Sequence, residues 1–243
     1  MNEQQDLKMQ LLEKYGDVKD KQSIDFCREA YQFLVEGDIV KFECTKEGTV
    51  TIERTTPVRS KSASAPIAVD LGLPSGRLWA DRNIGASSPE DVGLYFSWGN
   101  TDGHVFGTDY NFCEDYENTP GSKLTGDIDA EHDAATVNMG APWRLPTSDD
   151  FQELCDNCTH ELCYRNGYNG MLFTSKINGN SIFFPCSGYG NGSSWNNRGG
   201  GGHYWSSSLN SATYGRSLGF HSGGVYPQHN SSRFYGFAGR AVQ

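Results

Sequence analysis

The last 67 residues of this 243-residue chain, from Ile177 to Gln243, contain no lysine, no aspartate and no glutamate. The whole protein carries 20 basic and 30 acidic residues, so the absence is confined to one region. A segment without carboxylates cannot supply a carboxylate active site, and one with so few charges is not a solvated connector. It holds four Arg, three of the six His, and many Gly, Ser, Asn and aromatic residues. This composition is typical of a binding surface on a folded scaffold.

Other absences exclude further classes of protein. No apolar run approaches the roughly 18–20 residues that span a bilayer, so we expect no membrane insertion. The polar start, MNEQQD, lacks the apolar core of a signal peptide, so we expect synthesis in the cytoplasm. A net charge of -10 leaves no basic patch for phosphates, which argues against a nucleic-acid partner. The odd number of cysteines, seven, favours reduced thiols.

Catalytic and metal-binding patterns are also missing. The chain has no Gly-x-Ser-x-Gly elbow and no phosphate loop, so we predict no enzymatic activity and no catalytic residue. Two clusters have suitable metal ligands but unsuitable spacing. The first, too compact for a usual zinc finger, consists of Cys155, Cys158, His160 and Cys163. The second, without the glycine of an EF-hand loop, consists of Asp127, Asp129, Glu131 and Asp133. We predict no metal and no cofactor, with a structural calcium at the second cluster as the alternative.

Hydrophobic periodicity divides the chain into a small module, a linker and a main domain. Residues 1–54 predict two helices, at 3–15 and 23–37, and a β-hairpin with strands at 40–44 and 50–52. Residues 55–65, rich in Ser, Thr and Pro, predict a linker or a surface strap. The module either extends the packing of the main domain or serves attachment, including formation of a homo-oligomer.

Residues 66–243 predict an α+β domain with more strand and loop than helix. One helix should begin near Thr147 or Ser148, either of which would cap it, and should carry Phe151 and Leu154. Residues 102–133 are expected to be loops. Short strands separated by glycine-rich breaks are expected at 69–73, 78–80, 171–175, 181–184, 204–208, 216–221 and 234–240.

Five segments of the main domain carry a resemblance to a known family. They are VDLGLPSGRLWADRNIGA (69–86), PEDVGLYFSWGN (89–100), DAATVNMGAPWRLPTSDDFQEL (133–154), YWSSS (204–208) and RFYGFAGRAV (233–242). Over roughly residues 66–243 the chain resembles the Fibrobacter-succinogenes-type major paralogous domain common in Bacteroidetes. That group is a branch of the C-type-lectin fold related to formylglycine-generating enzymes, so the resemblance implies a C-type-lectin fold. The related enzymes depend on cysteines near their C-terminal end, and residues 187–243 contain none.

The glycine-rich C-terminus, with YWSSS and the closing R-x-x-G-F-x-x-R, is similar to the variable region of target proteins of diversity-generating retroelements. In these systems an error-prone reverse transcriptase randomises adenines in Asn-type codons, which produces neither Lys nor Glu. The resemblance implies a variable region at about 200–243 that binds an unknown protein or cell-surface ligand. It also implies display on a phage particle or at a cell surface, through a partner. The alternative is a carbohydrate-binding or structural surface module of the same fold that is not diversified.

Alternation along strands separates scaffold from display within this region. In residues 216–221, Leu218 and Phe220 point to one side, so Ser217, Gly219 and His221 point to the other. The expected scaffold is Trp205, Leu218, Phe220, Val225, Gly236, Phe237 and Arg240. The predicted ligand-binding residues are Ser211, Thr213, Tyr214, Arg216, Gly219, His221, Gly224, Tyr226, His229, Asn230, Ser231, Phe234 and Tyr235.

Two alternatives for the aromatic residues stay open. Tyr226, Phe234 and Tyr235 could instead be ordinary core residues of short strands. Trp195, within a Gly, Ser and Asn run, belongs either to the core or to a ligand surface.

Overall fold

The computed structural model describes the backbone of residues 40–44 and 50–54 and all atoms of residues 65–243. The chain divides into two compact units, residues 1–62 and 63–243, which are described separately. In the first unit, β1 (Val40–Cys44) pairs antiparallel with β2 (Val50–Arg54), which confirms the predicted hairpin. The predicted helices at 3–15 and 23–37, and residues 55–64 of the linker, lie outside the described residues.

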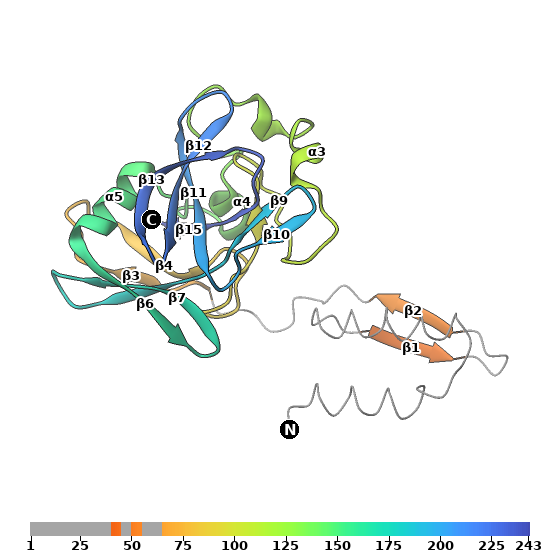
Figure 1. The fold of residues 1–243 in the computed structure, drawn as a ribbon, viewed down its shortest axis with the longest axis horizontal. Coiled ribbons are helices and arrows are strands. Elements are labelled where there is room, and N and C mark those ends of the chain that lie inside the picture. Colours follow the sequence, from red (N-terminus) through yellow and green to blue (C-terminus); the bar gives the residue numbers. More distant parts are fainter. Residues whose placement is uncertain (1–39, 45–49, 55–64) are drawn as a thin grey trace. The chain divides into compact units, whose positions relative to one another are not determined.

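The second unit is an α+β structure built mostly from strands (Figure 1). Its helical elements are α3 (Phe112–Tyr116), the 3-10 helix η1 (Pro120–Lys123), α4 (Ala134–Met139) and α5 (Ser148–Asn157). Its strands are β3 (Ala68–Asp70), β4 (Leu78–Asn83), β5 (Tyr95–Phe96), β6 (Cys158–Arg165), β7 (Tyr168–Ser175), β8 (Ser181–Pro185), β9 (Tyr189–Asn191), β10 (Ser194–Asn196), β11 (Gly201–Leu209), β12 (Tyr214–His221), β13 (Gly224–Ser232), β14 (Phe237–Ala238) and β15 (Arg240–Val242). No helix of the described residues is both long and apolar enough to cross a bilayer.

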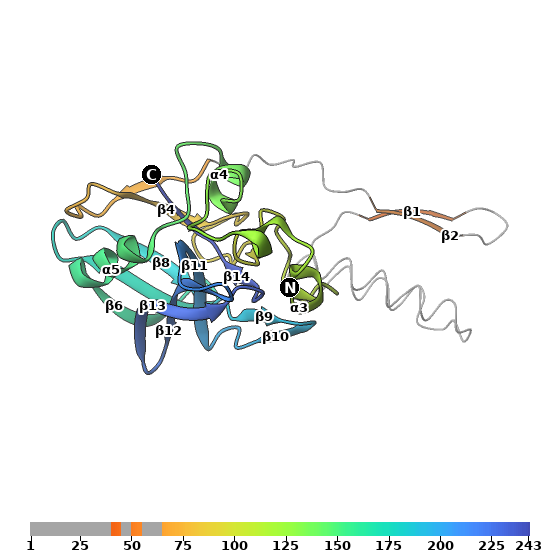
Figure 2. The ribbon, with the colours of Figure 1, turned by 90° about the horizontal axis from the view of Figure 1, so that it is seen from above.

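The strands of this unit form three larger sheets and one small ribbon. The largest has the order β13-β12-β11-β14-β5, in which only the β11–β14 pair is parallel. The other two have the orders β15-β4-β3 and β6-β7-β8, and β9 pairs with β10. Figure 2 shows β12 and β13 on one side of the domain and β4 with α4 on the opposite side.

The core lies on both faces of β11 and β12. Tyr204 pairs with Leu218, and both belong to the cluster that contains Phe151 and Leu154 of α5. The neighbouring Trp205 faces the other way, into a second cluster that includes Phe237. Burial on both faces fixes the register of a strand, because a slip by one residue would exchange the two faces.

Helix α5 begins as predicted. Thr147 is the N-cap, and its side chain and that of Asp150 form a capping box. Capping satisfies backbone N–H groups that have no partner within the helix. The helix ends at Asn157, and Cys158 already belongs to β6.

The predicted secondary structure needs three corrections. Residues 102–133 contain α3 and η1 and are not only loops. Residues 158–165 and 224–232 form the long strands β6 and β13, which were not predicted. The single strand expected at 234–240 is a turn followed by β14 and β15, which belong to different sheets. Buried Arg233 and Arg240 hold the two ends of this segment.

Candidate ligand-binding face

Three strands bring side chains together in rows across one face of the largest sheet. His203 of β11, Gly219 of β12 and Tyr226 of β13 are paired neighbours, so they share that face. The pairing of Ser217 with His229 places His229 on the same face, and His221 follows Gly219 by two residues. The sequence therefore gathers three histidines and a tyrosine on adjacent strands.

Aromatic contacts extend this surface in both directions. The ring of Tyr226 lies 5.5 Å from His221 and 6.4 Å from His229, measured between centroids. On the other side, Tyr189 lies 5.1 Å from His203 and 5.6 Å from Tyr235. Tyr235 in turn contacts Phe234 at 4.8 Å. We call this surface the open face; it consists of Tyr189, His203, Gly219, His221, Tyr226, His229, Phe234 and Tyr235.

The open face is accessible at its rim and firmly supported beneath. Tyr226 is 43 % exposed, and His221 and His229 are exposed as well. Tyr189, His203, Phe234 and Tyr235 are half-buried. Below them, Phe237 stacks on buried Trp205 at 4.3 Å. Aromatic residues that are partly held by packing present contact area with little loss of side-chain entropy on binding.

Gly219 makes a gap in the centre of the open face. A Cβ atom built there would meet only Nδ1 of His203, at 3.8 Å. Two residues earlier on the same strand, a Cβ at Gly215 would lie 2.5 Å from the Trp98 ring. The face thus has space at Gly219 and is closed at Gly215.

His203 is held in its neutral form. Burial, followed by the charges of His229 and His221, lowers the pKa of His203 to about 4. Its Nδ1 atom is buried and has no hydrogen-bond partner among the described residues. At neutral pH the centre of the open face is therefore uncharged, with aromatic and imidazole groups as its contacts.

Two buried arginines flank the segment that carries Phe234 and Tyr235. Arg233 is 2 % exposed; its Nε donates to the Tyr116 hydroxyl, and Nη1 donates to the carbonyls of Leu124 and Ala212. Nη2 donates to the Gly121 carbonyl, and the guanidinium lies 4.4 Å from the centre of the Trp98 ring. These bonds join the end of β13 to the loop around η1.

Arg240 is fully buried and joins β15 to two other strands. Its guanidinium donates to Asn83 Oδ1 at 2.9 Å, to the Ala80 carbonyl at 2.9 Å and to the Phe183 carbonyl at 2.7 Å. It also lies 4.3 Å from the centre of the Phe184 ring. Burial lowers the pKa of Arg240 to about 10, so it stays protonated at neutral pH. Arg233 and Arg240 therefore fix both ends of the segment between them.

The structure brings together some of the thirteen predicted binding residues and separates others. Those on the open face or at its β12–β13 turn are Gly219, His221, Gly224, Tyr226, His229, Phe234 and Tyr235. Ser211 and Thr213 lie in the β11–β12 turn and Tyr214 begins β12, at the other end of that strand, where the Ser211 hydroxyl accepts from the backbone of Thr213 and Tyr214. Arg216 and Asn230 are bonded to each other at 2.7 Å on the face of the sheet that carries α5.

Exposure of Ser231 was wrongly predicted. Ser231 is 4 % exposed, and its hydroxyl is hydrogen-bonded to that of Ser217 at 3.0 Å. It pairs with Gly215, where the Trp98 ring covers the sheet, so this end of the face is closed. Gly219 is buried too, and it contributes a gap where a side chain was expected.

The expected scaffold is buried except for Val225, which is half-buried against the first core cluster. Trp205, Leu218, Phe220, Phe237 and Arg240 are all at most 2 % exposed. Tyr226 is too exposed for a core residue, whereas Tyr235 packs partly against the second core cluster. Trp195 packs at 5.1 Å from Tyr95 and donates to the Thr108 carbonyl, so it belongs to a small core cluster away from the open face.

Two residues of the open face were not predicted. His203 follows four glycines, and Tyr189 lies in a short ribbon far from the C-terminus. The available signal for His203 was its position two residues before buried Trp205, on the same side of β11. Tyr189 had no local signal, because its place depends on the packing of β9 against β14.

A groove of about 430 Å³ adjoins the open face beside α5. Its lining is Gln152, Tyr226, Pro227, Gln228, His229 and Asn230. None of the six is a carboxylate, and the amide groups offer both donors and acceptors.

The clusters considered for metal ions have other roles. Asp133 caps α4 and also accepts from the Leu145 backbone, and Asp127 accepts from the Leu209 backbone. In residues 65–243 no group of three His, Cys, Asp or Glu side chains has the arrangement of a metal site. Burial raises the pKa of Cys155 to about 12 and that of Cys158 to about 11. Such thiols stay protonated and are weak nucleophiles.

Neither protein-family models nor curated proteins nor solved structures give a match to this chain.

Proposed function

We propose that this chain is a ligand-binding variable protein of a diversity-generating retroelement, built on a C-type-lectin fold. The open face binds an unknown protein or another cell-surface ligand, and no chemical step follows. The variable positions are those of the open face within residues 200–243, and Tyr189, the buried arginines and the aromatics beneath the face are constant. Residues 1–54 attach the domain to other copies or to the structure that displays it.

The observation that carries the proposal is the pairing of composition with position. Lys, Asp and Glu are absent from residues 177–243, and the three histidines and Tyr226 of this segment share one face of three adjacent strands. Tyr, His and Phe supply contact area, and the gap at Gly219 leaves room for other side chains. A surface that varies in this way needs support that does not vary.

Arg233 and Arg240 supply that support through contacts that do not involve the open face. Their seven donor contacts go to Asn83 and Tyr116 and to backbone carbonyls elsewhere in the domain. Backbone carbonyls are present whatever side chains the open face carries. The fold can therefore tolerate replacement of Phe234 or Tyr235 without losing these bonds.

Sequencing of the DNA around the gene tests the proposal. We expect a near-copy of the region that encodes residues 200–243, and a reverse transcriptase gene close by. Differences between the two copies should fall on codons of the open face, including His203, Gly219 and His229. They should spare the codons of Trp205, Leu218 and Arg240. Absence of the copy, or differences spread evenly over buried positions, would refute diversification.

A second function is favoured by the groove beside α5. A tyrosine ring next to three amide side chains suits a sugar, which presents both hydroxyl groups and an apolar ring face. This fits the alternative of a carbohydrate-binding module that is not diversified. A glycan array probed with the wild-type chain and with Gln228→Ala decides it. Binding lost in the variant, together with no copied region in the DNA, would replace the first proposal with this one.

A further inference from the structure

Strand β6 is a long and regular edge strand. All eight of its residues pair with β7 without a bulge, through a two-residue turn of Asn166 and Gly167 with φ values of 46° and 94°. It is the outer strand of the sheet β6-β7-β8 (Figure 1). Within residues 65–243, no backbone hydrogen bond from another segment reaches its outer edge. An edge of this kind offers a row of unpaired backbone groups to another strand.

Two common protections of an edge strand, proline and a β-bulge, are missing from β6. It contains no proline and no lysine, whereas β13, the edge of the largest sheet, has Pro227 and a register shift, and α5 packs against it. Such features block the pairing of edges between molecules. The difference indicates that the edge of β6 is available for pairing.

One face of β6 continues the hydrophobic core outward. Leu162 pairs with buried Met171, so Leu162 and Tyr164 share the face of the core cluster. Yet Leu162 is 43 % exposed and Tyr164 is 70 % exposed. These two side chains therefore form an apolar strip beyond the last covered strand.

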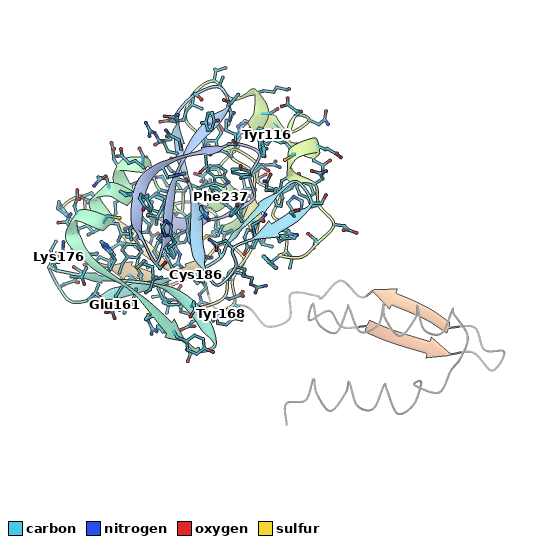
Figure 3. All side chains as sticks on the ribbon, in the orientation of Figure 1. Tyr116, Glu161, Tyr168, Lys176, Cys186 and Phe237 are labelled. Atoms are coloured by element: carbon cyan, nitrogen blue, oxygen red, sulfur yellow. The ribbon has the colours of Figure 1, made fainter. Side chains whose placement is uncertain are left out.

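The other face carries Glu161, Cys163 and Arg165. Among the described residues, neither Glu161 nor Arg165 forms an ion pair. Figure 3 shows Glu161 at the periphery of the domain. Arg165 lies 5.6 Å from the centre of the Phe183 ring, which holds it on this face of the sheet.

We propose that β6 pairs antiparallel with β6 of a second copy of this chain, with Cys163 on the two-fold axis. In this register Glu161 faces Arg165 of the second copy, and Leu162 faces its Tyr164. Both contacts occur twice because the interface is two-fold symmetric. The charges meet on one face and the apolar side chains on the other, so each face is complementary to itself.

Neighbouring registers do not have this complementarity. If Leu162 lay on the axis, Glu161 would face Cys163 of the second copy, and Arg165 would face its Thr159. If the axis lay between Leu162 and Cys163, Glu161 would face Tyr164 of the second copy, and Arg165 would face its His160. Only the register centred on Cys163 pairs the charges, and opposite charges on facing residues favour one register over others.

The hydrogen-bonding pattern of the hairpin agrees with the same register. A two-residue turn closes on a hydrogen-bonded pair, here Arg165 and Tyr168. By alternation, the N–H and C=O groups of Leu162 and Tyr164 then point to the outer edge, and those of Cys163 do not. The two copies of Cys163 would form a non-hydrogen-bonded pair with Cα atoms about 4.5 Å apart, within reach of a disulfide.

Sedimentation equilibrium of the full chain under reducing conditions tests the dimer. We expect a reversible dimer that Glu161→Arg weakens by about tenfold or more, because each of its two new arginines faces Arg165 of the other copy. The double variant Glu161→Arg with Arg165→Glu should restore the dimer, because the exchanged charges face each other again. A chain that is monomeric at ~100 μM, or a dimer that Glu161→Arg leaves unchanged, would overturn the proposal.

Oxidation supplies a second test that is specific for the register. Diamide takes two hydrogen atoms from two thiols and leaves a disulfide, so the wild-type dimer should become covalent through Cys163. Cys163→Ser should abolish this product, and Cys113→Ser, which removes a half-buried thiol of α3, should not. A covalent dimer that persists in Cys163→Ser would contradict the register. Both tests are independent of the ligand of the open face.

Discussion

The two long hairpins of the domain, β6–β7 and β12–β13, differ in the regularity of their pairing and in their burial. In β11, β12 and β13 the pairing shifts at two places, between Trp205 and Leu209 and between Ser217 and Gly219. This sheet is held by side chains buried on both faces. The β6–β7 pairing is unbroken over eight residues, but most of β6 is exposed.

The difference separates two kinds of surface. The open face can change its side chains because its support lies in residues below and beside it, such as Trp205 and Arg240. The outer edge of β6 depends on the identity of a few residues, because its partner must match Glu161 and Arg165 in one register. Under the two proposals, the open face tolerates variation and the outer edge of β6 makes one fixed contact.

Removal of the Arg240 side chain gives the largest expected effect. Arg240→Ala leaves the carbonyls of Ala80 and Phe183 buried without these donors and opens a cavity beside Phe184. The free energy of unfolding should fall by about 3–5 kcal/mol. Arg216→Ala, which removes a half-buried arginine from β12 of the largest sheet, should change it by less than about 0.5 kcal/mol. Urea unfolding measures the free energy of unfolding of both variants. An equal decrease in the two would show that the buried contacts of Arg240 do not stabilise the fold.

The pH dependence of stability gives the next largest effect. The pKa of His203 is about 4 in the fold and about 6.5 in the unfolded chain, so the unfolded state binds the proton first as pH falls. The stability due to the neutral imidazole is complete above pH 6.5 and is lost between pH 6.5 and 4. A shift of this size corresponds to about 3 kcal/mol.

His203→Phe isolates this loss from the titration of other groups. Phenylalanine keeps the packing against Phe237 and Tyr189 and carries no proton. The variant should be about as stable as the wild type at pH 7.5 and more stable at pH 4.5. His160→Gln, an exposed histidine on β6, is the control for loss of an imidazole elsewhere. If His203→Phe follows the wild-type pH profile, His203 does not titrate as inferred.

Substitution of two glycines on β12, Gly215 and Gly219, should give a smaller difference in stability. Gly215→Ser places Cβ against the Trp98 ring and should cost about 1–3 kcal/mol through overpacking. Gly219→Ser has open space next to His203 and should change stability by less than about 1 kcal/mol. Thermal unfolding measures both. Gly219→Ser matching Gly215→Ser would mean that the gap in the open face is not free for variation.

The sequence was a good guide where the pattern is local and the burial complete. The cap of α5 follows from Thr147 and Asp150, three residues apart, and the buried scaffold follows from alternation around Leu218 and Phe220. Both signals lie within a few residues and depend on one element. The same reasoning failed at Ser231, which pairs with Gly215 at the place where the Trp98 ring, more than a hundred residues away in the sequence, covers the sheet.

Strands β6 and β13 were missed for related reasons. On β6 the core side carries His160 between Cys158 and Leu162, and the other side carries Cys163 between Glu161 and Arg165, so the alternation of apolar and polar residues is incomplete. On β13, Pro227 and a run of polar residues hide a strand that is recognised only by its pairing with β12. The place of His203 beside Tyr226 also depends on pairing across three strands and on a register shift.

The smallest expected change in stability comes from exposed tyrosines on the two hairpins. Tyr226→Ser on the open face and Tyr164→Ser on β6 each remove a side chain that is at least 43 % exposed. Each should change the free energy of monomer unfolding by about 0.5 kcal/mol or less, measured in urea at a low protein concentration.

The two variants should differ completely in their effects on association. Tyr226→Ser should lower the affinity for the ligand and leave the dimer intact, because Tyr226 lies on the open face. Tyr164→Ser should weaken the dimer, because Tyr164 faces Leu162 of the second copy, and leave the ligand affinity of each domain unchanged. If Tyr226→Ser weakened the dimer as much as Tyr164→Ser does, the two surfaces would not be separate, and the open face would itself be the contact between copies.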